Sequence, residues 1–103
     1  MASGILGQYT LQANTDTVVY TVPAAKITTC SINIVNRNVN TATLRIALSS
    51  TSSPSNSEFL EYGATLNQSG VLERTGIVLD AGKNIIVYSD VVDVTVNVYG
   101  FED

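Results

Sequence analysis

The sequence has no histidine, no tryptophan and a single cysteine, and these absences exclude several kinds of active site. Without histidine, neither a Ser-His-Asp nor a Cys-His catalytic arrangement can form, and a histidine-based zinc site is impossible. A lone cysteine supplies neither a thiolate zinc site nor an intrachain disulfide. Cys30 alternates with Ile32 and Ile34, which places the three side chains on the same face of a predicted strand. We therefore expect Cys30 to be a buried apolar side chain.

Charge is also scarce, since charged residues make up only 14% of the chain and the formal net charge is −4. Binding to a phosphate backbone depends on several clustered Lys or Arg side chains, so nucleic acid is not an expected partner. Hydrophobic residues reach 45%, which is too many for a disordered chain. No apolar run approaches the roughly 20 residues of a membrane span, so no membrane contact is expected. The cations are scattered along the sequence: Lys26, Arg37, Arg45, Arg74 and Lys83.

The length of 103 residues fits one domain, residues 1–103, with a single core. The first residues lack the basic region and the long apolar region of a secretory signal, so we expect cytoplasmic synthesis without export. Residues 1–7 are a candidate N-terminal arm, because Ile5 and Leu6 would promote non-specific association if they were exposed. Such an arm adds a strand either to its own sheet or to the sheet of a neighbouring subunit.

Short runs rich in Val, Ile, Thr and Tyr are separated by clusters of Asn, Ser, Gly, Asp and Pro, which is the all-β pattern. No segment shows a sustained helical period. We predict a single antiparallel β-sandwich of about eight strands, either a jelly roll or an Ig-like Greek key. The expected strands are residues 5–12, 17–22, 26–36, 41–49, 59–66, 71–79, 84–89 and 92–101.

Apolar alternation predicts which strand faces are buried: Leu44, Ile46 and Leu48 share one face, and Val92, Val94, Val96 and Val98 share another. Gly82 can adopt a positive φ, so residues 80–83 predict a tight hairpin between the flanking strands. Residues 22–26 form a second reversal, which a proline begins. Residues 49–57 are too polar to be buried and long enough to protrude.

Several features could carry chemistry, and each has a simpler structural explanation. Asp90 and Asp93 could hold a hard cation, but calcium takes about six to eight oxygen ligands, so we expect a solvated turn and no metal. The other carboxylates show no spacing that singles out a glycosidase pair, and the glycines form no phosphate loop. No catalytic residue and no cofactor is expected. The tyrosines could stack on sugars, although they are more simply residues at the edge of the core: Tyr9, Tyr20, Tyr62, Tyr88 and Tyr99.

Six segments spread over nearly the whole chain form a familiar pattern. They are YTVPAAK (residues 20–26), SINIVNRN (31–38), EY (61–62), GIVLDAG (76–82), IVYS (86–89) and NVYG (97–100). Together they resemble a group of small structural proteins of tailed bacteriophages. In that group the first segment usually contains Val-Pro-Ala-Gly-Lys, and Ala25 stands here in place of the glycine.

The resemblance implies a compact β-sandwich used as a capsid decoration protein or as part of the tail or its fibres, and it brings no catalytic residues. We therefore expect a non-enzymatic virion structural protein, first of all a capsid decoration (cement) subunit on the particle exterior. Its expected partners are the major capsid protein or tail proteins and further copies of itself. The alternative is a tail- or fibre-associated module that binds a host-surface carbohydrate. The predicted interface residues are Ile5, Leu6, Tyr99 and Phe101, because a lone sandwich has little reason to expose apolar groups there.

Overall fold

The computed structural model describes residues 3–103 and is all-β, with eight strands and a short 3-10 helix, η1. The predicted ranges of β5, β6 and β7 agree with the structure, and those of the other strands differ by at most two residues at either end. In the described residues no helix is both long enough and apolar enough to cross a membrane. The elements in chain order are β1 (Ser3–Thr10), β2 (Thr17–Thr21), β3 (Thr28–Asn36), β4 (Ala42–Ser49), η1 (Asn56–Glu58), β5 (Phe59–Leu66), β6 (Val71–Leu79), β7 (Asn84–Ser89) and β8 (Val94–Glu102).

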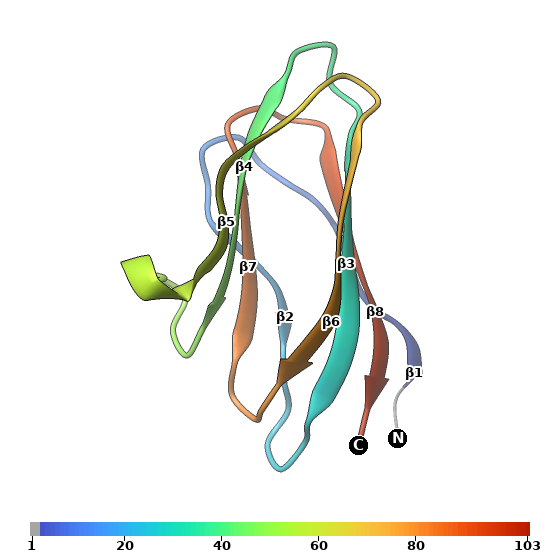
Figure 1. Ribbon diagram of the computed structural model, residues 1–103, viewed down its shortest axis with the longest axis vertical. Coiled ribbons are helices and arrows are strands. Elements are labelled where there is room, and N and C mark those ends of the chain that lie inside the picture. Colours follow the sequence, from blue (N-terminus) through green and yellow to red (C-terminus); the bar gives the residue numbers. More distant parts are fainter. Residues whose placement is uncertain (1–2) are drawn as a thin grey trace.

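The strands form two four-stranded sheets, which Figure 1 shows edge-on as two packed layers. Sheet A has the order β1-β8-β3-β6, sheet B has the order β2-β7-β4-β5, and all neighbouring strands are antiparallel. The chain changes sheet at every connection except the one from β4 to β5. Two interleaved Greek keys with this strand order define a jelly roll. The β-sandwich prediction is thus confirmed, and the jelly roll is the correct one of its two topologies.

The core lies between the inner faces of the sheets, as the alternation predicts. Cys30, Ile32 and Ile34 are 3%, 0% and 0% exposed. In β4, Leu44 and Ile46 are fully buried and Leu48 packs against the same core while partly exposed. The predicted last strand, residues 92–101, begins two residues too early. Val94, Val96 and Val98 are buried, but Val92 lies before β8 in a turn and is 50% exposed.

The predicted hairpin at residues 80–83 is wrong in one respect. The tight turn is present, because Gly82 has a φ of 82° and the Lys83 N–H donates to the Asp80 carbonyl at 3.3 Å. However, β6 belongs to sheet A and β7 to sheet B, so the strands it joins do not pair with each other. Turn chemistry specifies a local change of direction and does not specify whether the next strand stays in the same sheet.

The N-terminal segment belongs to the domain's own sheet. From Ser3 onwards it is β1, which pairs with β8, while Met1 and Ala2 of the predicted arm lie outside the described residues. A register shift between Ile5 and Gly7 places a bulge at Leu6. At this side of the sandwich β1 passes close to β2, since a Cβ built on Gly7 would lie 2.6 Å from the Val19 carbonyl oxygen.

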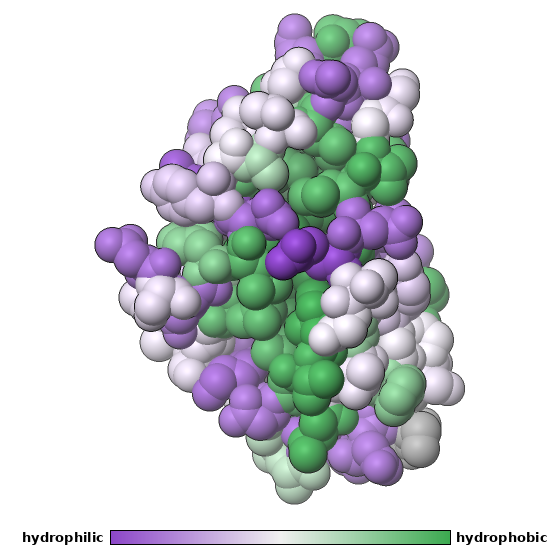
Figure 2. Space-filling model, viewed as in Figure 1, coloured by the Kyte–Doolittle hydropathy of each residue, from purple (hydrophilic) through white to green (hydrophobic). Residues whose placement is uncertain are grey.

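The opposite side of the sandwich, where β5 and β6 form the sheet edges, is more open. Figure 2 shows apolar side chains along this side, with a strongly hydrophilic group across the middle. An ion pair between Arg74 of β6 and Glu61 of β5, with an N–O distance of 3.3 Å, links the two edges. Leu60 and Leu72 from the same strands pack against the core while remaining partly exposed. In the described residues β5 and β6 do not pair with each other, and side-chain contacts link the two sheet edges here.

Candidate functional site

Three of the four predicted interface residues come together on the outer face of sheet A. Ile5 of β1 lies directly opposite Tyr99 of β8, and Phe101 follows on the same face of β8. Ile5 is 60% exposed and Phe101 is 48% exposed. The row through Phe101 continues across Thr29 of β3 to Val78 of β6, which is 64% exposed. The strand register thus gathers an apolar patch at this end of the sheet.

Leu6, the fourth predicted residue, lies elsewhere. It sits at the bulge of β1, is half-buried and packs against the core between the sheets. Its side chain therefore stabilises the domain and does not contribute to the patch formed by Ile5, Tyr99 and Phe101. Strict alternation from Ile5 does put Leu6 on the inner side, but the sequence left open whether this segment pairs within its own sheet or with a neighbouring subunit.

The outer face of sheet A carries very little charge. Of the described side chains on this face, Glu73 is the only charged one. It accepts a hydrogen bond of 3.0 Å from the Tyr99 hydroxyl. This hydrogen bond is the main reason why the pKa of Tyr99 is raised. Further along the same face, Gln8 Nε2 donates to Asn97 Oδ1 at 2.9 Å. The face is therefore apolar at the Phe101 end and neutral and polar in the middle.

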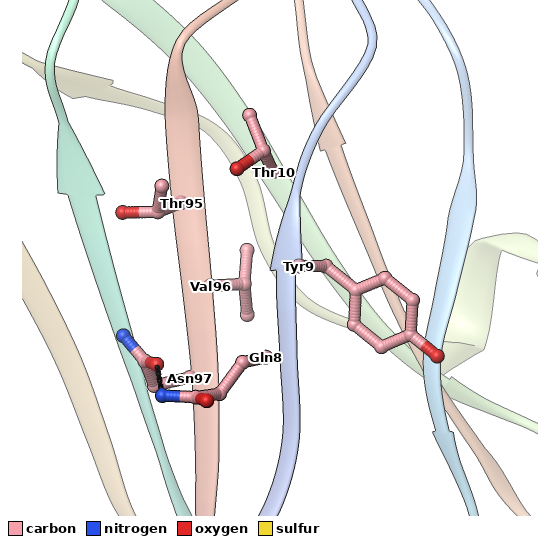
Figure 3. Close-up of a pocket in the computed structure, with 6 residues that line it drawn as sticks. All are labelled: Gln8, Tyr9, Thr10, Thr95, Val96 and Asn97. Carbon is pink, nitrogen blue, oxygen red and sulfur yellow. Dashed lines mark hydrogen bonds between the residues drawn. The ribbon is translucent and has the colours of Figure 1, made fainter.

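A hollow of about 340 Å³ lies over β1 and β8, next to this polar part of the face. Figure 3 shows that the Tyr9 ring points away from the other lining side chains and toward the neighbouring strand. The lining supplies hydroxyl and amide groups and no carboxylate, amine or thiol, so it favours binding contacts and not acid–base chemistry. The residues that line it are Gln8, Tyr9, Thr10, Thr95, Val96 and Asn97.

The outer face of sheet B presents a row of aromatic side chains around an arginine. Arg45 of β4 lies between Tyr88 of β7 and Tyr62 of β5 and directly faces both across the strand register. Its Cζ atom is 4.6 Å from the centroid of each ring, which is cation–π geometry. The Tyr88 hydroxyl donates to Asn14 Oδ1 at 3.0 Å and fixes that end of the row. We call Tyr88, Arg45 and Tyr62 the aromatic row.

The Tyr62 end of the row is the accessible one. Tyr62 is 66% exposed and meets Phe59 edge-on, with ring centroids 4.9 Å apart and an interplanar angle of 80°. A hollow of about 230 Å³ beside these two rings is lined by Asn56, Phe59 and Tyr62. The sequence predicted that the tyrosines could stack on sugars, but it did not identify Arg45 as their neighbour, because that contact depends on the register of three strands.

The aromatic row lies beside an apolar pair that is buried on the outside of sheet B. Ala47 and Ile86 are cross-strand neighbours and are 1% and 2% exposed, yet they do not belong to the core between the sheets. Val18 continues the same row on one side and Phe59 on the other. The outer surface of sheet B is thus partly a second packed layer, which holds the neighbouring aromatic side chains in place.

The protruding loop is confirmed for residues 50–55, which lead into η1, and Figure 1 shows this segment extending from the molecule before β5. Ser49, predicted to be part of the loop, is instead the last residue of β4 and is only 1% exposed. Glu58 at the end of η1 organises the loop, because its Oε1 accepts hydrogen bonds from the Ser55 N–H at 2.8 Å and from the Ser49 hydroxyl at 2.9 Å. These hydrogen bonds lower the pKa of Glu58, and the one from the Ser55 backbone has the largest effect. The ordered loop in turn positions Asn56 beside the hollow at Tyr62.

The two carboxylates considered for a cation have structural roles in a turn. Asp90 Oδ1 accepts a hydrogen bond of 2.7 Å from the Thr43 N–H. Asp93 has a φ of 62°, and its carbonyl oxygen accepts from the Arg37 N–H at 2.9 Å. Within residues 3–103 no group of three or more Cys, Asp or Glu side chains is arranged to hold a metal ion.

Comparison of the chain with known protein families, with curated proteins and with solved structures finds no match in any of the three. The resemblance to structural proteins of tailed bacteriophages therefore stays a prediction that rests on the sequence segments.

Proposed function

We propose that the protein is a non-enzymatic virion structural protein of a tailed phage, and specifically a capsid decoration subunit that attaches through the outer face of sheet A. The observation that carries the proposal is the patch of Ile5, Tyr99 and Phe101 on a face with a single described charge. Two other facts support it. The sequence segments resemble phage structural proteins, and the jelly roll recurs in viral capsid domains as well as in lectins.

The physical argument concerns what such a face gains when it is covered. The centres of protein interfaces are depleted in charged residues and enriched in aromatic ones, as this face is. Burying the exposed half of Phe101 contributes about 2 kcal/mol at roughly 25 cal/mol per Å² of apolar area. The neutral amides of Gln8 and Asn97 can exchange hydrogen bonds with a partner without the desolvation cost of a charge. The expected partners are the major capsid protein or a tail protein, with further copies of this chain in the assembled particle.

The test is incorporation into particles. The double variant Ile5→Ser/Phe101→Ser should keep the fold, because both side chains are exposed, and should lower occupancy on undecorated particles by about tenfold or more, as expected for loss of an aromatic anchor. The matched control is Val39→Ser, which removes an equally apolar side chain that is 75% exposed outside the sheets. Occupancy is measured by co-sedimentation and electron microscopy. Equal decoration by the double variant and the control would refute attachment through this face.

The second candidate function is that of a tail- or fibre-associated module that binds a host-surface carbohydrate. The specific observation in its favour is Tyr62, an exposed aromatic ring beside a hollow that Asn56 also lines. Exposed aromatic rings bind the apolar faces of sugars, and amides bind their hydroxyl groups. A glycan array separates the two candidates, because a pure decoration subunit retains no glycan.

A further inference from the structure

We propose that the aromatic row on the outer face of sheet B binds an acidic sugar, with Arg45 holding the sugar carboxylate and Tyr62 stacking on the sugar ring. The proposal rests on the second candidate function, carbohydrate recognition, and is independent of assembly through sheet A. The two surfaces lie on opposite sides of the sandwich, so occupation of one leaves the other free.

Arg45 is a cation without a protein anion. Among residues 3–103 it takes part in no ion pair and no side-chain hydrogen bond, whereas Arg74 pairs with Glu61 and Lys83 with Asp80. Glu61, which precedes Tyr62 in β5, is directed to the other side of that strand and is already engaged by Arg74 at 3.3 Å. The N–H donors of the Arg45 guanidinium are therefore available to a ligand.

The guanidinium is also held in position before any ligand arrives. Tyr62 and Tyr88 contact it from the two neighbouring strands at the same distance of 4.6 Å, and both cation–π contacts favour this position of the guanidinium. The hydrogen bond from the Tyr88 hydroxyl to Asn14 fixes the Tyr88 ring, and the edge-on contact with Phe59 fixes the Tyr62 ring. A fixed planar guanidinium favours bidentate binding of a carboxylate, because little side-chain entropy remains to be lost.

The surroundings select a sugar among the possible carboxylates. The hollow of about 230 Å³ adjoins the exposed ring of Tyr62, where the apolar face of a pyranose can stack. Asn56 lines the same hollow and supplies an amide for sugar hydroxyls. A small carboxylate without a ring would use Arg45 and leave the other two side chains without a role.

The charge of the chain argues for a singly charged ligand. With a formal net charge of −4 and scattered cations, the protein repels polyanions such as nucleic acid. The aromatic row of this acidic protein contains one guanidinium, which matches one carboxylate on an otherwise neutral glycan. The competing explanation is that the row only shields Ala47 and Ile86 from water, in which case no saccharide binds.

The direct test observes Arg45 in the wild-type protein by NMR of the arginine Nε–Hε groups. Titration with sialyllactose and with monomeric galacturonic acid, each of which carries one carboxylate, should shift the Arg45 signal, while lactose, the neutral counterpart of sialyllactose, should bind at least tenfold more weakly. The chain has three arginines, so the signal is assigned by its absence in Arg45→Gln. Chemical shifts of Arg37 and Arg74 serve as internal controls and should stay unchanged.

Variants then separate charge from geometry. Arg45→Gln should weaken binding of the acidic sugar at least tenfold, whereas Arg37→Gln, the same charge change at an exposed position between β3 and β4, should leave it unchanged. Arg45→Lys keeps the charge but loses the bidentate geometry, and it should also bind more weakly. Equal binding of lactose and sialyllactose would overturn the acid assignment and leave carbohydrate recognition standing. Absence of binding by every saccharide would overturn both.

Discussion

The Tyr20 hydroxyl donates a hydrogen bond to the Glu102 carboxylate and so joins β2 of sheet B to β8 of sheet A. Glu102 is only 5% exposed, and Thr28, its cross-strand neighbour, has a buried hydroxyl oxygen without a hydrogen-bond partner among the described residues. Burial first, and then the hydrogen bond to Glu102, raise the pKa of Tyr20 to about 12. The phenol is therefore held neutral by its place between the sheets.

This relationship predicts how stability depends on high pH. The folded-state pKa of Tyr20 is raised from 10.0 to about 12. The contribution of Tyr20 to the free energy of unfolding is therefore fully present below pH 10 and is lost as the pH rises through about 12. Tyrosinate absorbance should show one tyrosine that ionises last, and Tyr20→Phe should remove that step. Urea unfolding across the same range should show a steeper loss of stability in the wild type than in Tyr20→Phe. Ionisation of all five tyrosines together near pH 10 would contradict the assignment.

Ala25 provides a prediction in the stabilising direction. It has a φ of 61°, a left-handed conformation that costs a non-glycine residue about 1–2 kcal/mol. Ala25→Gly removes this strain but adds about 0.4–1 kcal/mol of unfolded-chain entropy, so the free energy of unfolding should rise by about 0.5 kcal/mol. Ala24→Gly, whose φ is not positive, should lower it instead. Thermal melts of both variants measure the difference, and a lower Tm for Ala25→Gly than for the wild type contradicts the strain.

Local chemistry in the sequence was enough to locate the strands. Alternation marked the buried face of β3 through Cys30, Ile32 and Ile34, and turn residues marked the ends of β5, β6 and β7. What the sequence could not supply was the pairing of distant segments. The sequence of residues 80–83 predicts a tight turn. The same turn is compatible with a next strand in the same sheet or in the facing sheet, because the turn energy is nearly the same in both cases.

The candidate surfaces were predictable to the same extent. Ile5, Tyr99 and Phe101 are conspicuous because they are apolar at the ends of strands, and the register brings them together. Leu6 looked equivalent to Ile5 as long as the segment could serve as a free arm. Arg45 gave no signal of its own, since its partners Tyr62 and Tyr88 are 17 and 43 residues away along the chain.

Cys30 allows the register of β3 to be checked in solution. Its side chain is 3% exposed, and burial raises the pKa of the thiol to about 11. Because the thiolate is the reactive form, iodoacetamide should label the native protein very slowly at pH 8 and label it readily in urea. Mass spectrometry of intact protein gives both rates. Native labelling as fast as in urea would mean that β3 is shifted by one residue, with Cys30 on the outer face.

Gly100 offers the sharpest test of how sheet A is packed. A Cβ at this position would lie 2.1 Å from the Thr29 carbonyl oxygen and 2.6 Å from the Cys30 Cα, both of them backbone atoms of the paired strand β3. Backbone atoms in the middle of a sheet cannot move aside without breaking strand pairing. Gly100→Ala should therefore destabilise the domain by about 3 kcal/mol, the upper end of the usual cost of overpacking.

The matched control for Gly100 is Gly63→Ala in the edge strand β5. Gly63 also has a positive φ, 80°, but a Cβ there would meet no heavy atom within 4 Å, so this variant pays only the backbone strain of about 1–2 kcal/mol. Chemical denaturation of the two variants should separate a steric clash from the shared conformational strain. If both lose the same stability, β3 and β8 are not as close at Thr29 as the structure places them. Since Phe101 follows directly, a loss specific to Gly100→Ala should also reduce attachment through sheet A.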